Sequence, residues 1–203
     1  MNTKKGFTLL ELLIVIGILA ILSTTIVLVI NPAELLKKAR DSQRISDLNT
    51  VKTAIAYYVT EESSPSIGSL STAQTYSDVS SVNCGGTNTN PSATTTQSVD
   101  GTGWIPISFK DMPGGSPIAS LPTDPNKSVD STGVYYYVYL VGSDTNYTFK
   151  LVANMESDYY KNDGSGDVES TDGGVNVNLY EVGTDMDIAI TVGTNCYNGE
   201  TAS

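Results

Sequence analysis

The sequence predicts an α+β protein in which a long N-terminal membrane-spanning helix, kinked near Pro32, packs on a mostly antiparallel four-stranded sheet. Two observations predict this class. Residues 7–60 show an unbroken apolar run followed by an amphipathic helical pattern, whereas residues 134–203 hold short runs of β-branched and aromatic residues separated by turns. One long helix followed by consecutive strands is typical of α+β proteins. The chain of 203 residues is long enough for one folded domain beyond the helix.

The apolar run extends from Phe7 to Ile30 and contains one charged residue, Glu11. At about 1.5 Å per residue it forms roughly 36 Å of helix, which is enough to cross a bilayer core of ~30 Å. It is longer than the apolar core of a secretory signal peptide, and no small-residue cleavage site follows it. We therefore expect a leader over residues 1–6 and a membrane-spanning helix over residues 7–30.

A second, amphipathic helix is expected over residues 31–60. Asn31 is a favourable N-cap, Pro32 suits the first helical position and Glu34 suits the third. Pro32 also disfavours helical backbone at Asn31, so the kink between the two helices is predicted at these two residues. Apolar residues then recur at helical spacing and predict a stripe that lies on the sheet. The stripe consists of Leu35, Leu36, Ala39, Ile45, Leu48, Val51, Ile55, Tyr58 and Val59.

Residues 61–133 form a connecting region rich in Ser, Thr and Gly. We expect long irregular connections there, with short ordered pieces. The apolar segment 104–107 is expected to pack as a short strand or an apolar peg. The Pro-rich segment 121–125 is expected to form a rigid turn that leads into the sheet.

Residues 134–203 are expected to hold the antiparallel sheet and an acidic loop. The four predicted strands are Val134–Val141, Tyr147–Ala153, the alternating segment around Val175–Leu179, and Ile188–Val192. The first two strands are separated by a turn and predict a hairpin. In the third, Val175, Val177 and Leu179 alternate with polar residues, which is typical of a half-buried strand.

The acidic loop lies between the second and third predicted strands. Asp163, Ser165, Asp167 and Glu169 fall on alternate positions among glycines. Hard cations such as Ca²⁺ prefer several oxygen ligands from a tight turn, so Asp163, Asp167 and Glu169 are candidate metal ligands. The pattern does not fit an EF-hand. Asp-Gly turns in a solvated loop explain the same residues without a metal, and both interpretations stay open.

The chain has two cysteines, Cys84 and Cys196. If the body lies outside the cytoplasm, a disulfide between them is permitted, and we expect this bond to form. It would close a long loop and stabilise the fold by roughly 4–5 kcal/mol on a chain-entropy estimate. The alternative is two free thiols.

Composition and charge exclude several function classes. The chain has no His, which removes the commonest general base. No nucleophile–base pair or phosphate-binding loop stands out, so we expect that the protein is not an enzyme. Residues 1–52 carry seven Lys or Arg and four Asp or Glu, whereas residues 53–203 carry four and eighteen. An acidic body argues against a direct nucleic-acid surface.

The segment from Lys4 to Val15, KKGFTLLELLIV, resembles the N-terminal signature of type IV pilins and of the related pseudopilins of type II secretion and DNA-uptake systems. The resemblance implies that a prepilin peptidase cleaves after Gly6 and that the new N-terminal residue, Phe7, is N-methylated. It implies that Glu11 meets the N-terminal amine of a neighbouring subunit during assembly. Pairing with a cation would offset the cost of a carboxylate in hydrocarbon.

The resemblance also implies a pilin-like fold and a set of partners. These are identical subunits in a homopolymeric filament, the prepilin peptidase and an inner-membrane assembly machinery. The protein would be a single-pass protein of the cytoplasmic membrane before assembly and part of an extracellular pilus afterwards. Major pseudopilins have an acidic, calcium-binding loop near this part of the sheet, so Ca²⁺ is the one cofactor that the resemblance suggests.

Three functions follow as expectations. The first is a structural subunit of a type IV pilus-like filament, in which adhesion, motility or DNA uptake would be properties of the filament. The second is a pseudopilin of a secretion or DNA-uptake system, which a calcium loop would favour. The third is a membrane-anchored cation- or glycan-binding module that never polymerises, which an uncleaved leader would favour.

Overall fold

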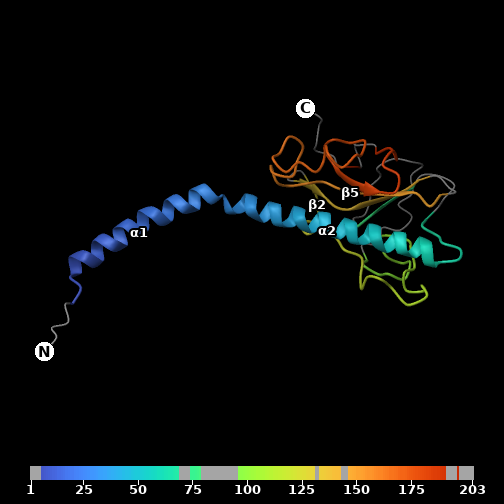
Figure 1. Cartoon of the computed structure of the whole chain (residues 1–203), viewed down its shortest axis with the longest axis horizontal. Helices are drawn as coiled ribbons and strands as arrows, with labels where there is room; N and C mark the ends of the chain where they lie inside the picture. The colour runs from blue at the N-terminus through green and yellow to red at the C-terminus, as the bar shows by residue number, and fades with distance from the viewer. Residues whose placement is uncertain are drawn as a thin grey trace.

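The computed structural model describes residues 6–68, 74–78, 96–130, 133–142 and 146–190, together with Cys196. Two helices come first: α1, Leu9–Ile30, and α2, Pro32–Glu61. Figure 1 shows α1 projecting away from the folded body, with α2 running through the body between the sheet on one side and the loops of residues 96–125 on the other. The protein is therefore a helix-and-sheet body with an extended N-terminal helix, and the α+β class is confirmed.

The large apolar side chains described in the first part of α1 are exposed. Phe7 is 83% exposed, and the large apolar residues from Leu9 to Leu22 are 46–82% exposed. The helix is 22 residues long, or about 33 Å. In the part of the chain whose side chains are described, no helix meets the length and apolarity needed to cross a membrane.

The two helices meet at Asn31, the residue at which the sequence predicts the kink. Asn31 adopts the left-handed conformation, with φ 44° and ψ 77°. Its side chain accepts a hydrogen bond from the Glu34 backbone N–H, and Pro32 occupies the first turn of α2. The left-handed residue ends α1, and the same residue caps α2.

The main sheet is antiparallel and has the strand order β1-β4-β5-β6. Its strands are β1, Gln74–Ser77; β4, Val138–Val141; β5, Phe149–Ala153; and β6, Tyr180–Gly183. A separate two-stranded hairpin joins β2, Ser128–Asp130, and β3, Gly133–Tyr135. In the main sheet, Val141 pairs with Phe149 and Val152 pairs with Glu181.

The sheet has a hydrophobic cluster on each face. The larger cluster packs α2 residues Leu48, Val51 and Ile55 against inward-facing sheet residues such as Tyr139 and Leu151. The smaller cluster covers the opposite face and consists of Tyr136, Val138, Leu140, Val152, Leu179 and Cys196. The segment 104–107 supplies an apolar peg, because Trp104, Ile105 and Ile107 are buried in the larger cluster.

The observed strands differ from the predicted set in several places. The predicted strand over residues 134–141 is divided, since β3 ends at Tyr135 and β4 begins at Val138. Residues 188–190 are irregular, and 191–192 lie outside the described residues. The edge strand β1 comes from the segment expected to connect the helix to the sheet.

The third predicted strand is wrong over residues 175–179. Val175 and Val177 are each 52% exposed, and the strand begins only at Tyr180. Backbone N–H groups here donate to side chains instead of to a neighbouring strand. The Asn176 N–H, for example, donates to Glu181 Oε2 at 3.0 Å. Alternating apolar residues therefore lie in a loop whose amides are satisfied locally.

Candidate functional site

The N-terminal site consists of the residues that carry the predicted processing and assembly roles. Gly6 and Phe7 are exposed and non-helical, and α1 begins two residues after Phe7. The Gly6–Phe7 peptide bond therefore lies in non-helical, exposed backbone, which suits a protease substrate. Lys4 and Lys5, the basic residues of the predicted leader, lie outside the described residues.

Thr8 and Glu11 form a capping box at the start of α1. The Glu11 carboxylate oxygen Oε2 accepts hydrogen bonds from the Thr8 N–H at 2.8 Å and from the Thr8 hydroxyl at 2.7 Å. In return, Thr8 Oγ1 accepts from the Glu11 N–H at 3.2 Å. This arrangement satisfies two donors at the end of the helix and holds the carboxylate beside Phe7. The sequence analysis gave no role to Thr8, although its spacing from Glu11 is the capping-box signature.

A buried ion cluster joins α2 to the body. Arg44 is fully buried and bonds to three carboxylates. Its Nε and Nη2 atoms donate to the two Asp124 oxygens at 2.8 Å, and its Nη1 donates to Asp41 at 2.7 Å. Nη2 also donates to Glu156, which receives two further hydrogen bonds from Arg40. We call Arg40, Asp41, Arg44, Asp124 and Glu156 the Arg44 cluster.

Arg44 and Glu156 keep their charges in the folded protein. Burial lowers the pKa of Arg44, whereas its bonds to Asp124 and Glu156 raise it, and the net change is a rise. Burial raises the pKa of Glu156, and bonds from the two arginines lower it below its usual value. The sequence analysis missed this cluster. Asp41 and Arg44 continue the buried stripe of Leu48 and Val51 toward the start of α2, which was the available signal.

A second buried carboxylate lies beside this cluster. Asp78 accepts hydrogen bonds from the backbone N–H groups of Asp124 and Tyr137, each at 2.9 Å. Lys127 Nζ is 3.9 Å from its Oδ2. Burial raises the pKa of Asp78 to about 6, because these contacts do not fully replace water around the charged form.

The three predicted metal ligands do not converge on a common point. Glu169 is 2% exposed, and its two oxygens accept from the Met155 and Asn162 N–H groups at 3.1 and 2.9 Å. Asp167 accepts from the N–H groups of Asp163 and Ser170. Across the described residues, no three His, Cys, Asp or Glu side chains are arranged to hold a metal ion. Both Glu169 oxygens instead accept bonds from backbone N–H groups, and the metal site stays a prediction.

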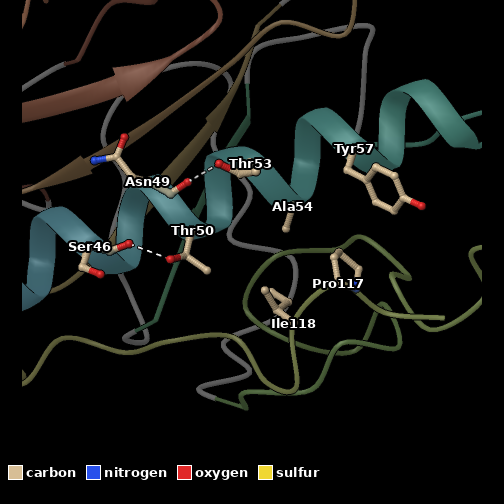
Figure 2. Close-up of a pocket in the computed structure, with 8 residues that line it drawn as sticks. All are labelled: Ser46, Asn49, Thr50, Thr53, Ala54, Tyr57, Pro117 and Ile118. Carbon is tan, nitrogen blue, oxygen red and sulfur yellow. Dashed lines mark hydrogen bonds between the residues drawn. The ribbon is translucent and has the colours of Figure 1, made fainter. Parts of the chain in front are cut away.

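A shallow groove of about 530 Å³ lies between α2 and the loop at Pro117 and Ile118 (Figure 2). The Thr50 and Thr53 hydroxyls at its edge donate to helix carbonyls one turn earlier. Tyr57, 43% exposed, is the aromatic residue of its lining. The lining residues are Ser46, Asn49, Thr50, Thr53, Ala54, Tyr57, Pro117 and Ile118. They offer hydroxyl, amide and apolar contacts, and they include no carboxylate or basic side chain for acid–base chemistry.

The cysteines are only partly described. Cys196 is buried in the smaller hydrophobic cluster of the sheet, and it takes part in a disulfide. Its predicted partner, Cys84, lies outside the described residues.

Comparison with known families matches residues 1–27 to the prokaryotic N-terminal methylation motif. This motif is the signature of type IV pilins and pseudopilins, so the resemblance found in the sequence is confirmed. No curated protein and no solved structure matches the chain. The motif implies a membrane-anchored precursor that a prepilin peptidase processes and an assembly machinery uses.

Proposed function

We propose that the chain is a structural subunit of an extracellular type IV pilus-like filament, cleaved after Gly6, methylated at Phe7 and polymerised through α1. The coarser conclusion, a type IV pilin-like or pseudopilin subunit, is what the methylation motif supports directly. Before assembly, α1 would lie in the cytoplasmic membrane; after assembly, it would pack with the same helix of identical subunits.

The observation that carries this proposal is the exposure of the large apolar side chains from Phe7 to Leu22, in the segment that the methylation motif covers. A soluble protein that leaves so many large apolar side chains uncovered has an interaction surface there. The body does not cover them, since its core begins in α2 at Leu48. Bilayer lipid and neighbouring helices are the two environments that would cover α1, and a pilin uses both in succession.

Glu11 supplies the polar part of the proposed assembly step. Cleavage after Gly6 creates an ammonium group on Phe7, four residues before Glu11, and the Thr8 contacts already hold the carboxylate at this end of the helix. In an apolar layer, a carboxylate and an ammonium group are far less costly as a pair than separately. Pairing therefore favours subunits whose N-termini lie at matching depths.

We also propose that the protein has no catalytic activity. The groove in Figure 2 has a lining without acid–base side chains, and the Arg44 cluster is buried and held by internal ion pairs. Both features support a structural role.

A pseudopilin remains the alternative, because the same motif heads both kinds of subunit. The two differ in where the processed chain accumulates. A pilin is recovered in material sheared from the cell surface, whereas a pseudopilin stays with the cell envelope. An uncleaved chain would instead indicate the anchored, non-polymerising module.

The test is a Glu11→Gln variant expressed in the native host lacking the wild-type gene. We expect the variant to be cleaved after Gly6 but lost from the sheared filament fraction. Glu34→Gln is the matched control, because Glu34 is also an acidic residue in the first turn of a helix but lies beyond the apolar segment, and it should assemble normally. Filaments of Glu11→Gln at the wild-type level would contradict the proposal.

A further inference from the structure

We propose that the acidic loop over residues 157–172 is a metal-independent clasp that fastens the beginning of α2 to the end of β5. This inference does not depend on whether the chain is a pilin or a pseudopilin. It rests on the hydrogen bonds that the loop carboxylates accept, on the packing of Tyr159 inside the loop and on the contacts between the loop and α2.

The carboxylates of the loop accept hydrogen bonds from nearby backbone N–H groups. Glu169 is buried, and each of its carboxylate oxygens faces a backbone N–H, from Met155 and from Asn162. Asp167 accepts from two further N–H groups and from the Ser170 hydroxyl. These N–H groups already stabilise the carboxylate charges and fix their orientation, so no cation is needed to hold the loop closed. The carboxylates therefore do the work of closing the loop that a cation would otherwise do.

The centre of the loop is filled by a side chain. A Cβ added at Gly166 would lie 2.1 Å from the Tyr159 ring, and one added at Gly164 would lie 2.4 Å from the Tyr159 carbonyl oxygen. The Gly166 N–H also donates to that oxygen at 2.9 Å. Asp163 adopts the left-handed conformation, φ 65°, between these contacts. The two glycines thus let the chain close tightly around Tyr159.

The loop contacts α2 at Lys38, Asp41 and Ser42. Lys38 Nζ lies 4.3 Å from the centre of the Tyr159 ring. The Ser42 and Tyr160 hydroxyl oxygens are 3.2 Å apart. Between them, Asp41 accepts from the Ser157 N–H at 2.8 Å and from the Ser157 hydroxyl at 2.6 Å. Side chains one turn apart on α2 are therefore bound to consecutive parts of the loop.

The position of the clasp gives it a mechanical role. The contacts begin at Lys38, two turns after the left-handed joint at Asn31. The Arg44 cluster shares Asp41 with these contacts and extends them to Arg44. The clasp thus defines where the helix becomes part of the body, and the joint lies before that point. Bending at Asn31 can redirect α1 while the clasp keeps α2 on the sheet.

Thermal unfolding of the full chain in detergent micelles tests the inference, measured with CaCl₂ and with EGTA. We expect one melting temperature for the wild type in both conditions. Glu169→Gln turns an acceptor into a donor that faces an N–H, so it should lower the melting temperature on the order of 5 °C, equally in both. Asp163→Asn is the matched control, because the exposed Asp163 side chain can be replaced without disturbing its left-handed backbone, and it should melt like the wild type.

A rise in the wild-type melting temperature with CaCl₂ that Glu169→Gln or Asp163→Asn removes would overturn the proposal. If Glu169→Gln does not fold, trypsin cleavage after Lys161 in the wild type gives the answer. Equal protection of this bond in CaCl₂ and in EGTA supports a metal-independent clasp, whereas protection only in CaCl₂ overturns it. An Asp41→Asn variant should be cleaved faster at Lys161, because it weakens the attachment of the loop to α2.

Discussion

Replacing Arg44 with Met removes the central cation of the buried cluster while keeping a long apolar side chain. Arg44 is fully buried and bonds to Asp41, Asp124 and Glu156, of which Glu156 alone keeps a second basic partner, Arg40. Breaking a buried ion pair from one side typically costs about 3–5 kcal/mol. For a domain of this size, that loss corresponds to a fall of roughly 6–20 °C in melting temperature.

The control for this prediction is Arg40→Met. Arg40 bonds to one carboxylate, and its side chain is 31% exposed, so water can replace part of the interaction. We expect a loss of about 1 kcal/mol for this variant. Both variants are compared by urea unfolding of the full chain in micelles, followed by tryptophan fluorescence of the buried Trp104.

The pH dependence separates unpaired charge from lost packing. In Arg44→Met, buried carboxylates without a cation have raised pKa values, so protonation stabilises the folded state as the pH falls. The loss of unfolding free energy in Arg44→Met, relative to the wild type, should therefore shrink as the pH falls from about 7 to about 4.5. Equal losses in the two variants, or a deficit of Arg44→Met that does not change with pH, would refute the assignment of the cluster as an electrostatic anchor.

Three further outcomes are expected. Burial raises the pKa of Asp78 to about 6, so its contribution to folding stability is fully present below its usual pKa of 3.8 and is lost as the pH rises through about 6. A carboxyl titration of Asp78 followed by NMR should show a midpoint near 6. A midpoint of about 4 would contradict the burial argument. Thr8→Val should lower filament yield and Thr8→Ser should restore it, because Ser keeps the hydroxyl that bonds Glu11; equal yields would remove any role for that hydroxyl. Alkylation without reduction should label neither Cys84 nor Cys196, and reduction should destabilise the body by roughly 4–5 kcal/mol; labelling of the unreduced protein would exclude the predicted pairing.

The helices could be predicted because their signals are local. The apolar run predicts α1, and Asn31 with Pro32 predicts the joint. The strand β5 was predicted correctly because its β-branched and aromatic residues follow a turn. These features depend on neighbours within a few residues, which a single sequence displays.

Other parts of the fold depend on distant partners. The strand β1 has the polar sequence Gln74–Ser77 and becomes a strand by pairing with β4. Arg44 meets Asp124 and Glu156 from 80 and 112 residues away in the chain. Sequence spacing places Asp41 and Arg44 on the buried stripe of α2, but it does not identify the partners that make their burial stable.

The acidic loop shows a different limit. The sequence presents Asp167 and Glu169 as oxygen donors near glycines, which suits a cation and suits backbone capping equally well. The structure shows the capping, because the N–H groups of Met155 and Asn162 donate to the Glu169 oxygens. The direction of those N–H groups depends on the folded backbone and is not encoded in residue spacing.

The most direct test of the proposed function is the intact mass and N-terminal residue of the chain in sheared extracellular material. We predict a chain that begins at N-methylated Phe7 in that fraction. The same processed chain confined to the cell envelope would contradict the pilus and favour a pseudopilin. A chain that still begins at Met1 and stays in the membrane would contradict the filament subunit altogether.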